Sequence, residues 1–162
     1  MKASSSLKQK KYISRIEELY CRIEEWLQGK SLNVRGGQSE VNEEVPGRYM
    51  VPTLTILDEK GKTIAQLQPV GAWLIGAEGR VDILGALDRD TLVYMQKGGP
   101  QVSTRTSIAG TSQKLDEQSR PLFKGIAEAG WYWIEDKRRG RARLLNAQLF
   151  MDLVSEVSDY GV

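Results

Sequence analysis

Histidine is absent from the 162-residue chain, and cysteine occurs only once, as Cys21. A disulfide within the chain therefore cannot form, and one chain cannot build a structural zinc site of the Cys/His type. Catalysis by Ser-His-Asp or Cys-His arrangements is excluded, as is any general base or pH switch that relies on imidazole. Any chemistry would have to use carboxylates, lysine, tyrosine, hydroxyls or an oxygen-bound metal. Because low cysteine content is compatible with a reducing compartment, we expect a cytoplasmic protein.

Long apolar runs are also missing. The longest one, from Val70 to Ile75, includes a glycine and is too short to cross a membrane. The N-terminal stretch MKASSSLKQKKYIS has no apolar region of the kind found in signal peptides. A net charge of +2 provides no global field toward nucleic acids or membranes. We therefore expect no membrane association.

Common motifs for phosphate, dinucleotide and calcium binding are incomplete or absent. The GKT at 61–63 lacks the first glycine of a phosphate-binding loop, because position 56 is Ile. It also joins two alternating segments rather than a strand and a helix. No GxGxxG is present, and Asp88 and Asp90 flank Arg89 without the spacing of a calcium-binding EF-hand. We expect no cofactor and no bound metal.

A seven-residue echo near the N-terminus predicts an amphipathic helix. RIEELYC at 15–21 is followed by RIEEWLQ at 22–28. The apolar stripe is wider than two heptads of a coiled coil need, which favours a helix lying on a sheet, with a coiled-coil dimer as the alternative. The helix is expected from about Leu7 to Gln28, after a mobile tail at 1–6. Cys21 lies beside the stripe, and we expect a small buried thiol there.

A second amphipathic helix is predicted at the C-terminal end, over Ala147–Ser158. Asn146 is a favourable N-cap residue. The apolar residues of the segment recur at helical spacing and would form one buried stripe, namely Leu149, Phe150, Leu153, Val154 and Val157.

Between the helices, alternating apolar and polar residues predict strands joined by short turns. Such spacing is typical of an antiparallel meander. Segments 29–47 and 98–120 are polar and are expected to be loops, the second with a possible edge strand at Gln101–Ser107, and Pro121–Ala129 is predicted as a short helix. The expected strands are Tyr49–Leu57, Thr63–Gln68, Val70–Ile75, Arg80–Leu84, Thr91–Met95, Trp131–Glu135 and Arg141–Leu145.

These elements predict an α+β fold with a mostly antiparallel sheet of five to seven strands. One amphipathic helix from each end of the chain would pack on it, most economically on the same face. The length suits a single domain, expected over residues 7–160.

The most distinctive segment is GWYWIEDKRRGRARLL, from Gly130 to Leu145. Trp131 and Trp133 fall on one face of the predicted strand, and Tyr132 and Ile134 on the other, so we expect these side chains in the core. The cations that follow belong to a separate hairpin turn: Lys137, Arg138, Arg139, Arg141 and Arg143.

Three interpretations of this basic hairpin remain open. The cations are solvated or paired with glutamates of the first helix, or they bind phosphates of a nucleic acid, or they dock on an acidic protein. Arginine suits phosphate and carboxylate oxygens equally well.

A metal-dependent nuclease is a further alternative, built from Asp82, Glu135 and Lys137. Such enzymes place an acid on one strand and a (D/E)xK pair on the next, where the carboxylates hold the metal. The match here is short, and Asp136 stands where a strand interior favours an apolar residue.

The sequence thus favours a non-enzymatic intracellular protein that binds another macromolecule, through a surface that includes residues 137–143. A protein is the leading partner, and a nucleic-acid-binding domain is the alternative. A small-molecule binder or enzyme with a tryptophan-lined pocket is a third hypothesis.

Overall fold

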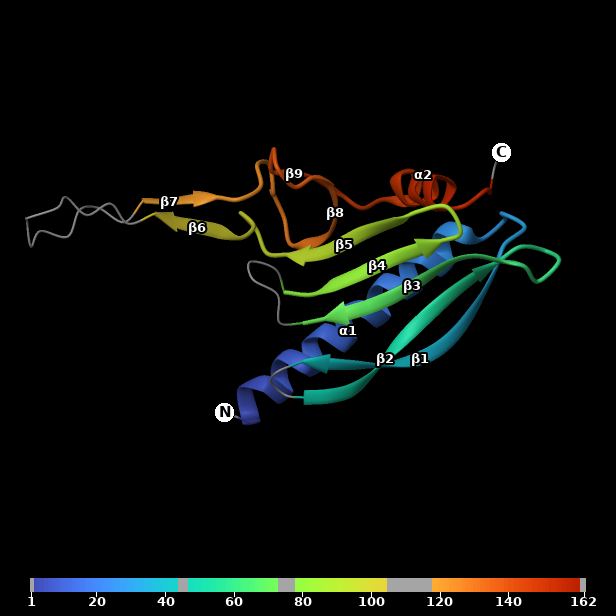
Figure 1. Ribbon diagram of the computed structural model, residues 1–162, viewed down its shortest axis with the longest axis horizontal. Coiled ribbons are helices and arrows are strands. Elements are labelled where there is room, and N and C mark those ends of the chain that lie inside the picture. Colours follow the sequence, from blue (N-terminus) through green and yellow to red (C-terminus); the bar gives the residue numbers. More distant parts are fainter. Residues whose placement is uncertain (1, 44–46, 73–77, 105–117, 161–162) are drawn as a thin grey trace, which may run out of the picture.

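The computed structural model describes residues 2–43, 47–72, 78–104 and 118–160. Within them lies a seven-stranded antiparallel sheet of order β1-β2-β3-β4-β5-β8-β9, together with a separate two-stranded sheet of β6 and β7 (Figure 1). The helices are α1 (Lys2–Leu27) and α2 (Ala147–Val157). The strands are β1 (Asn33–Glu43), β2 (Gly47–Leu57), β3 (Thr63–Gly71), β4 (Arg80–Gly85), β5 (Arg89–Met95), β6 (Gln101–Thr104), β7 (Gln118–Pro121), β8 (Gly130–Asp136) and β9 (Arg141–Leu144).

The predicted antiparallel sheet and the two terminal helices are confirmed. At the N-terminal end of α2, Asn146 Oδ1 accepts a hydrogen bond from Leu149 N at 2.8 Å, as its role as N-cap requires. Helix α1 begins at Lys2, earlier than the predicted start at Leu7, and the expected mobility of residues 1–6 stays a prediction. The expectation for Cys21 is wrong, because its thiol is exposed beside the buried stripe rather than within it.

Strand β1 corrects the prediction of a loop over 29–47. It pairs with β2 without interruption, from Asn33 opposite Leu57 to Glu43 opposite Gly47. β1 is the first strand in the sheet order, and most of its side chains are exposed. A strand at an edge needs little apolar alternation, so its polar and glycine-rich sequence resembles that of a loop.

Two other predictions near the strands need correction, and a third is confirmed as far as the structure describes it. Residues 118–121, expected as loop and helix start, form β7, and the rest of Pro121–Ala129 contains no helix. Gly125 has a φ of 78°, which a helix does not allow. The edge strand expected at Gln101–Ser107 is present as β6, with 105–107 outside the described residues.

The prediction of a separate strand over Val70–Ile75 is also wrong, because no new strand begins at Val70. β3 continues to Gly71 through a register shift between Pro69 and Gly71, and residues 73–75 lie outside the described part. Val70 is 39% exposed at this irregularity, so its apolar side chain belongs to no buried strand.

The sheet bends strongly at β2. Gln68 Nε2 of β3 donates a hydrogen bond to Ser39 Oγ of β1 at 2.5 Å, although β2 lies between these strands in the sheet order. β2 pairs with β3 only from Leu54 to Leu57, and its first half pairs with β1 alone. The part of the hairpin formed by the second half of β1 and the first half of β2 therefore turns toward β3 instead of extending a flat sheet.

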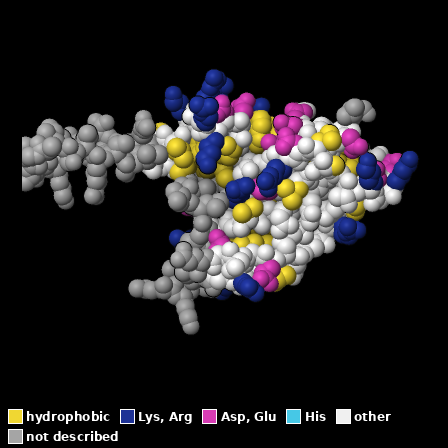
Figure 2. Space-filling model, in the orientation of Figure 1, with side chains coloured by type: hydrophobic (Ala, Val, Ile, Leu, Met, Phe, Trp, Pro, Cys, Tyr) yellow, Lys and Arg dark blue, Asp and Glu magenta, His cyan; other side chains and the backbone are white. Residues whose placement is uncertain are grey.

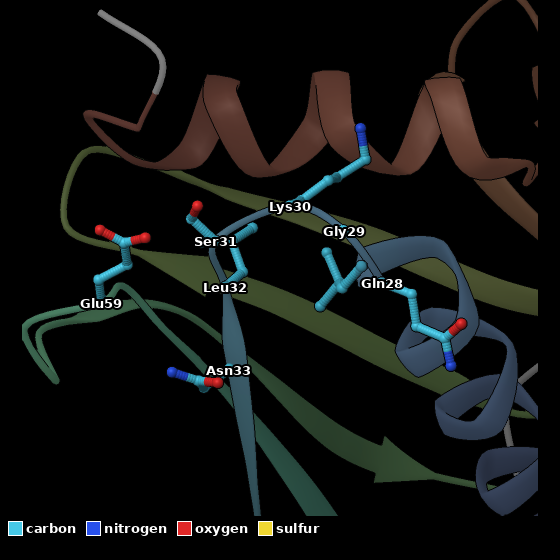
Figure 3. A pocket seen from close by; sticks show the side chains of 8 residues that line it. Gln28, Gly29, Lys30, Ser31, Leu32, Asn33 and Glu59 are labelled. Atoms are coloured by element: carbon cyan, nitrogen blue, oxygen red, sulfur yellow. The ribbon is translucent and has the colours of Figure 1, made fainter.

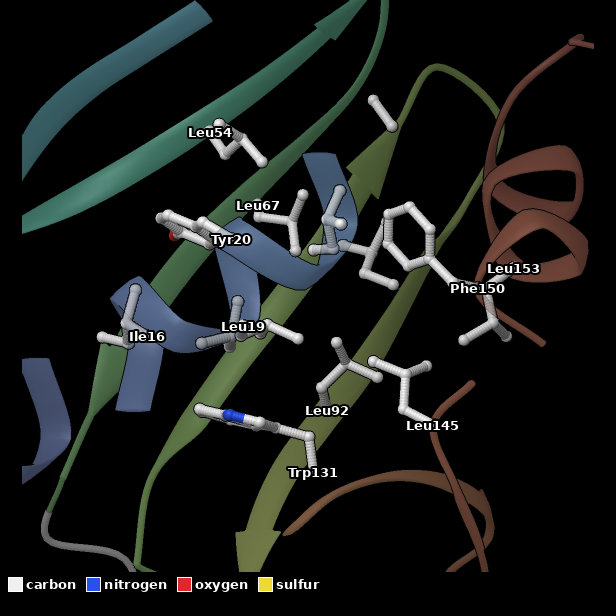
Figure 4. Close-up of a cluster of buried hydrophobic side chains, with 14 of the residues drawn as sticks. Ile16, Leu19, Tyr20, Leu54, Leu67, Leu92, Trp131, Leu145, Phe150 and Leu153 are labelled. Atoms are coloured by element: carbon white, nitrogen blue, oxygen red, sulfur yellow. The ribbon is translucent and has the colours of Figure 1, made fainter. Parts of the chain in front are cut away.

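One large cluster of buried side chains unites both helices with the sheet. Figure 4 shows Ile16 and Leu19 of α1 beside Leu67 and Leu92 of the sheet, with α2 contributing at one end. Trp26 of α1 and Phe150 of α2 contact each other with ring centroids 5.8 Å apart. Members of this cluster also include Tyr12, Tyr20, Ile23, Leu54, Ile56, Val81, Ile83, Trp131, Leu145, Leu149 and Leu153.

A second buried cluster lies where the chain returns from β7 to β8. Phe123 and Ile126 of the connecting segment pack with Val93, Met95 and Tyr132 of the sheet. Phe123 and Ile126 therefore anchor an irregular segment at a spacing that suits a helix, and this explains the false helix prediction. The segment also brings its backbone close to the β8–β9 hairpin.

Candidate functional site

The aromatic residues of β8 are structural. Trp131 is 5% exposed, and its indole Nε1 donates to the backbone oxygen of Arg15 in α1 at 3.2 Å. Tyr132 is 3% exposed, and its hydroxyl donates to the backbone oxygen of Glu128 at 2.7 Å. Half-buried Trp133 donates its indole N–H to Asp90 Oδ1 at 3.0 Å. The rings of Trp131 and Tyr132 are buried and offer no stacking platform, and half-buried Trp133 is held by Asp90 on the face that it shares with Arg143.

The turn of the basic hairpin (residues 137–143) is fixed by Asp136 and Gly140. Asp136 Oδ1 accepts hydrogen bonds from the backbone N–H groups of Arg138 at 3.0 Å and Arg139 at 3.2 Å. Gly140 has a φ of 65°, and a Cβ there would lie 2.4 Å from the backbone oxygen of Leu122. Glycine is required for both reasons, since other residues avoid positive φ and would collide. The cations are therefore presented from a defined turn.

The side chains of the basic hairpin are exposed: Lys137, Arg138, Arg139, Arg141 and Arg143. One internal ion pair is present, between Arg139 Nε and Asp136 Oδ2 at 3.7 Å, and both groups are accessible to solvent. The other four cations have no hydrogen-bond or ion-pair partner among the described residues, glutamates of α1 included. A weak, exposed pair of this kind leaves even Arg139 available to another anion.

The structure adds a cation that sequence reasoning missed. Lys124 donates its backbone N–H to the backbone oxygen of Gly140 at 3.2 Å, and its side chain is exposed. Figure 2 shows Lys and Arg side chains gathered over the end of the β8–β9 hairpin, beside hydrophobic surface. Lys124 lies far from the hairpin in sequence and within a segment taken for a helix, so no local pattern could reveal its placement.

Exposed leucines lie next to the basic hairpin. Leu122 is 42% exposed and precedes the segment that contacts Gly140, while Leu144 is 39% exposed at the end of β9. Leu144 lies directly opposite Tyr132, and a Cβ on the neighbouring Gly130 would come within 3.2 Å of it. The site therefore combines positive charge with accessible apolar side chains.

The residues of the nuclease alternative occupy separate places. Asp82 is 5% exposed on β4, and its carboxylate accepts two hydrogen bonds from Arg80, at 2.9 and 3.1 Å, and one from Thr91 at 3.3 Å. Strand β5 lies between β4 and β8, which carries the exposed Glu135, and Lys137 belongs to the turn. Within the described residues no group of three or more acidic, cysteine or histidine residues is placed to hold a metal ion.

The Asp82 carboxylate has a structural partner of its own. Its hydrogen bonds and negative charge raise the pKa of the Arg80 guanidinium, against the opposing effect of burial. This two-point contact occupies the oxygens that a metal would need. The geometry favours a structural ion pair within the sheet, between buried Asp82 and partly exposed Arg80.

A shallow depression at the end of α1 offers little chemistry. It has a volume of about 490 Å³, and Figure 3 shows Gln28, Lys30 and Ser31 around it, with Glu59 across from them. Lys30 and Glu59 are its only charged side chains, and the rest of the lining is short connecting chain. Trp26 packs on Phe150 and Trp131 lies in the core, so neither lines a pocket here.

None of the helices in the described part of the chain is long and apolar enough to pass through a membrane.

Comparisons with known proteins give this site no counterpart. No protein-family model, no curated protein and no solved structure matches the chain. Evidence about function therefore comes from the geometry of the basic hairpin and the residues around it.

Proposed function

We propose that this is a non-enzymatic intracellular protein that binds an acidic protein through the basic hairpin. The observation that carries the proposal is that Lys137, Arg138, Arg141 and Arg143 are exposed and have no partner among the described residues. Holding like charges on one turn costs free energy unless anions from elsewhere neutralise them. A cytoplasmic location, suggested by the single cysteine, belongs to the same proposal.

A protein partner is favoured over a nucleic acid by what surrounds the cations. Binding to single strands commonly adds stacking of bases on exposed aromatic side chains. Here Trp131 and Tyr132 are buried and Trp133 is half-buried with its N–H bonded to Asp90, whereas Leu122 and Leu144 are exposed. Apolar side chains next to arginines suit a protein surface that presents carboxylates together with aliphatic groups.

Nucleic-acid binding stays the second candidate, because exposed arginines also fit phosphates. The test measures affinity for poly-glutamate and for single- and double-stranded DNA and RNA across a salt series. It compares the wild type with a hairpin variant that carries Arg138→Ala, Arg139→Ala, Arg141→Ala and Arg143→Ala. We expect poly-glutamate to bind the wild type, weaken with salt, and lose about tenfold or more in affinity for the hairpin variant.

The outcomes separate the two candidates. Equal affinity of both proteins for poly-glutamate contradicts the proposal. Tight binding of a nucleic acid that the variant loses, together with no binding of poly-glutamate, replaces the protein partner with a nucleic acid. The variant's circular dichroism and thermal unfolding should match the wild type, because the substituted side chains are exposed.

A further inference from the structure

The outer edge of β9 has backbone groups without a hydrogen-bond partner among the described residues. β9 is the last strand in the sheet order, and no described strand lies beyond it. Leu145 N donates to Trp131 O at 2.9 Å, and Arg143 lies opposite Trp133. Residues of an antiparallel pair alternate between those bonded to the partner strand and those turned away from it. Leu145 and Arg143 are therefore turned toward β8, and Ala142 and Leu144 direct their N–H and C=O groups outward.

The side chains of β9 divide by face. Arg141 and Arg143 lie on one face and are exposed. Leu144 lies on the opposite face, together with Ala142, which lies opposite Ile134 and packs against the second buried cluster. The edge therefore presents two positive charges on one face and apolar surface on the other.

We infer that β9 accepts an extended acidic segment of the partner protein as an added antiparallel strand. The inference rests on the proposed function and names how the partner is held. Acidic side chains at alternate positions would lie beside Arg141 and Arg143, and apolar ones beside Ala142 and Leu144. Backbone hydrogen bonds to the outward groups supply affinity, and the alternation supplies specificity.

The geometry also specifies which backbone groups of the partner are used. Residues directly opposite one another in a bonded antiparallel pair exchange both hydrogen bonds and share a face. The partner residues opposite Ala142 and Leu144 are therefore the apolar ones. Their N–H groups point at β9, while the N–H groups of the acidic residues point away.

Synthetic peptides test this arrangement directly. The first alternates glutamate and valine, and the second has the same composition with glutamates and valines in separate blocks. We expect the alternating peptide to bind about tenfold or more tightly than the block peptide. N-methylation of the valine amides should abolish binding, whereas N-methylation of the glutamate amides should leave it intact. Equal binding of the alternating and block peptides, or equal effects of the two methylations, overturns the inference.

A substitution in β9 provides the matching test on the protein. Ala142→Pro removes an N–H that the fold does not use and places a ring where the added strand would lie. It should abolish binding of the alternating peptide and preserve binding of poly-glutamate, which needs only the cations. Ala142→Thr retains the N–H and is the control.

The poly-glutamate experiment tests the proposed function, and the peptide experiment tests the added strand separately. If the hairpin variant and the wild type bind poly-glutamate equally, the proposed function itself is contradicted. If that comparison succeeds but no alternating peptide binds, the arginines of β9 protect the edge from strand pairing, and the inference alone is contradicted. The peptide methylation experiment decides the matter even if Ala142→Pro does not fold.

Discussion

At the scale of single residues, the buried side-chain polar groups that the structure describes are satisfied by the fold, with one exception. Asp82 has three hydrogen bonds from Arg80 and Thr91. Asp90 differs, because its Oδ1 accepts from Trp133 while its buried Oδ2 has no hydrogen-bond partner among the described residues. Glu156 of α2 lies beside it. A protonated Glu156 has the donor that this oxygen needs.

This arrangement makes stability depend on pH. Partial loss of water around its carboxyl, the hydrogen bond that it donates to Asp90 when protonated, and the negative charges of Asp90 and Asp88 raise the pKa of Glu156 above its ordinary value of 4.5. The folded state therefore retains a proton that the unfolded state releases. Its contribution to stability is fully present below that ordinary value and is lost as the pH rises through the raised pKa.

Glu156→Gln should remove this loss, because the amide retains a donor and carries no charge. We expect a higher thermal unfolding midpoint than the wild type at neutral pH and a smaller difference in acid. Unfolding measured from acid to neutral pH checks this, with the exposed Glu24→Gln as control. A lower midpoint at neutral pH would show that the Glu156 charge stabilises the fold.

At the scale of elements, local patterns predicted both helices and most strands, since their periodicity and caps lie within short segments. β1 was missed because an edge strand with Gly36 and Gly37 carries no such pattern. Its pairing with β2 depends on residues that a linear pattern does not relate. The false helix at Pro121–Ala129 shows the reverse error, where spacing suited a helix but Phe123 and Ile126 anchor an irregular segment.

The contact between α1 and the sheet includes hydrogen bonds of one side chain as well as apolar packing. Tyr12 is fully buried, and its hydroxyl donates to the backbone oxygen of Arg80 at 2.6 Å and accepts from the backbone N–H of Gly71 at 3.1 Å. One side chain of α1 thus links the end of β3 to the start of β4. Burial also raises the pKa of the Tyr12 hydroxyl, so it stays neutral.

Tyr12→Phe should destabilise the protein by about 1–3 kcal/mol, because it leaves a buried donor and a buried acceptor without their partner. Denaturant unfolding provides the measurement. Tyr160→Phe is the control, since the structure shows no hydrogen bond of the Tyr160 hydroxyl with described residues. Equal stability of the Tyr12 variant and the wild type would mean that water satisfies these backbone groups.

At the scale of the whole molecule, a net charge of +2 conceals a local excess of positive charge on the basic hairpin. Sequence alone identified the cations of the basic hairpin and separated them from the core aromatics of β8. It could not place Lys124 or Leu122 beside them, because that requires the path of the chain after β7. Nor could it show that the glutamates of α1 leave these cations unpaired.

The central claim is that the position of the cations on the basic hairpin, and not the overall charge, determines binding. One measurement tests it: the affinity for poly-glutamate at low salt of the hairpin variant against a control that loses the same charge elsewhere. The control replaces exposed cations without ion-pair partners among the described residues, by Lys10→Ala, Arg35→Ala, Lys60→Ala and Arg89→Ala. We predict that the control binds within about threefold of the wild type while the hairpin variant loses about tenfold or more. Equal losses in the two variants would contradict the account.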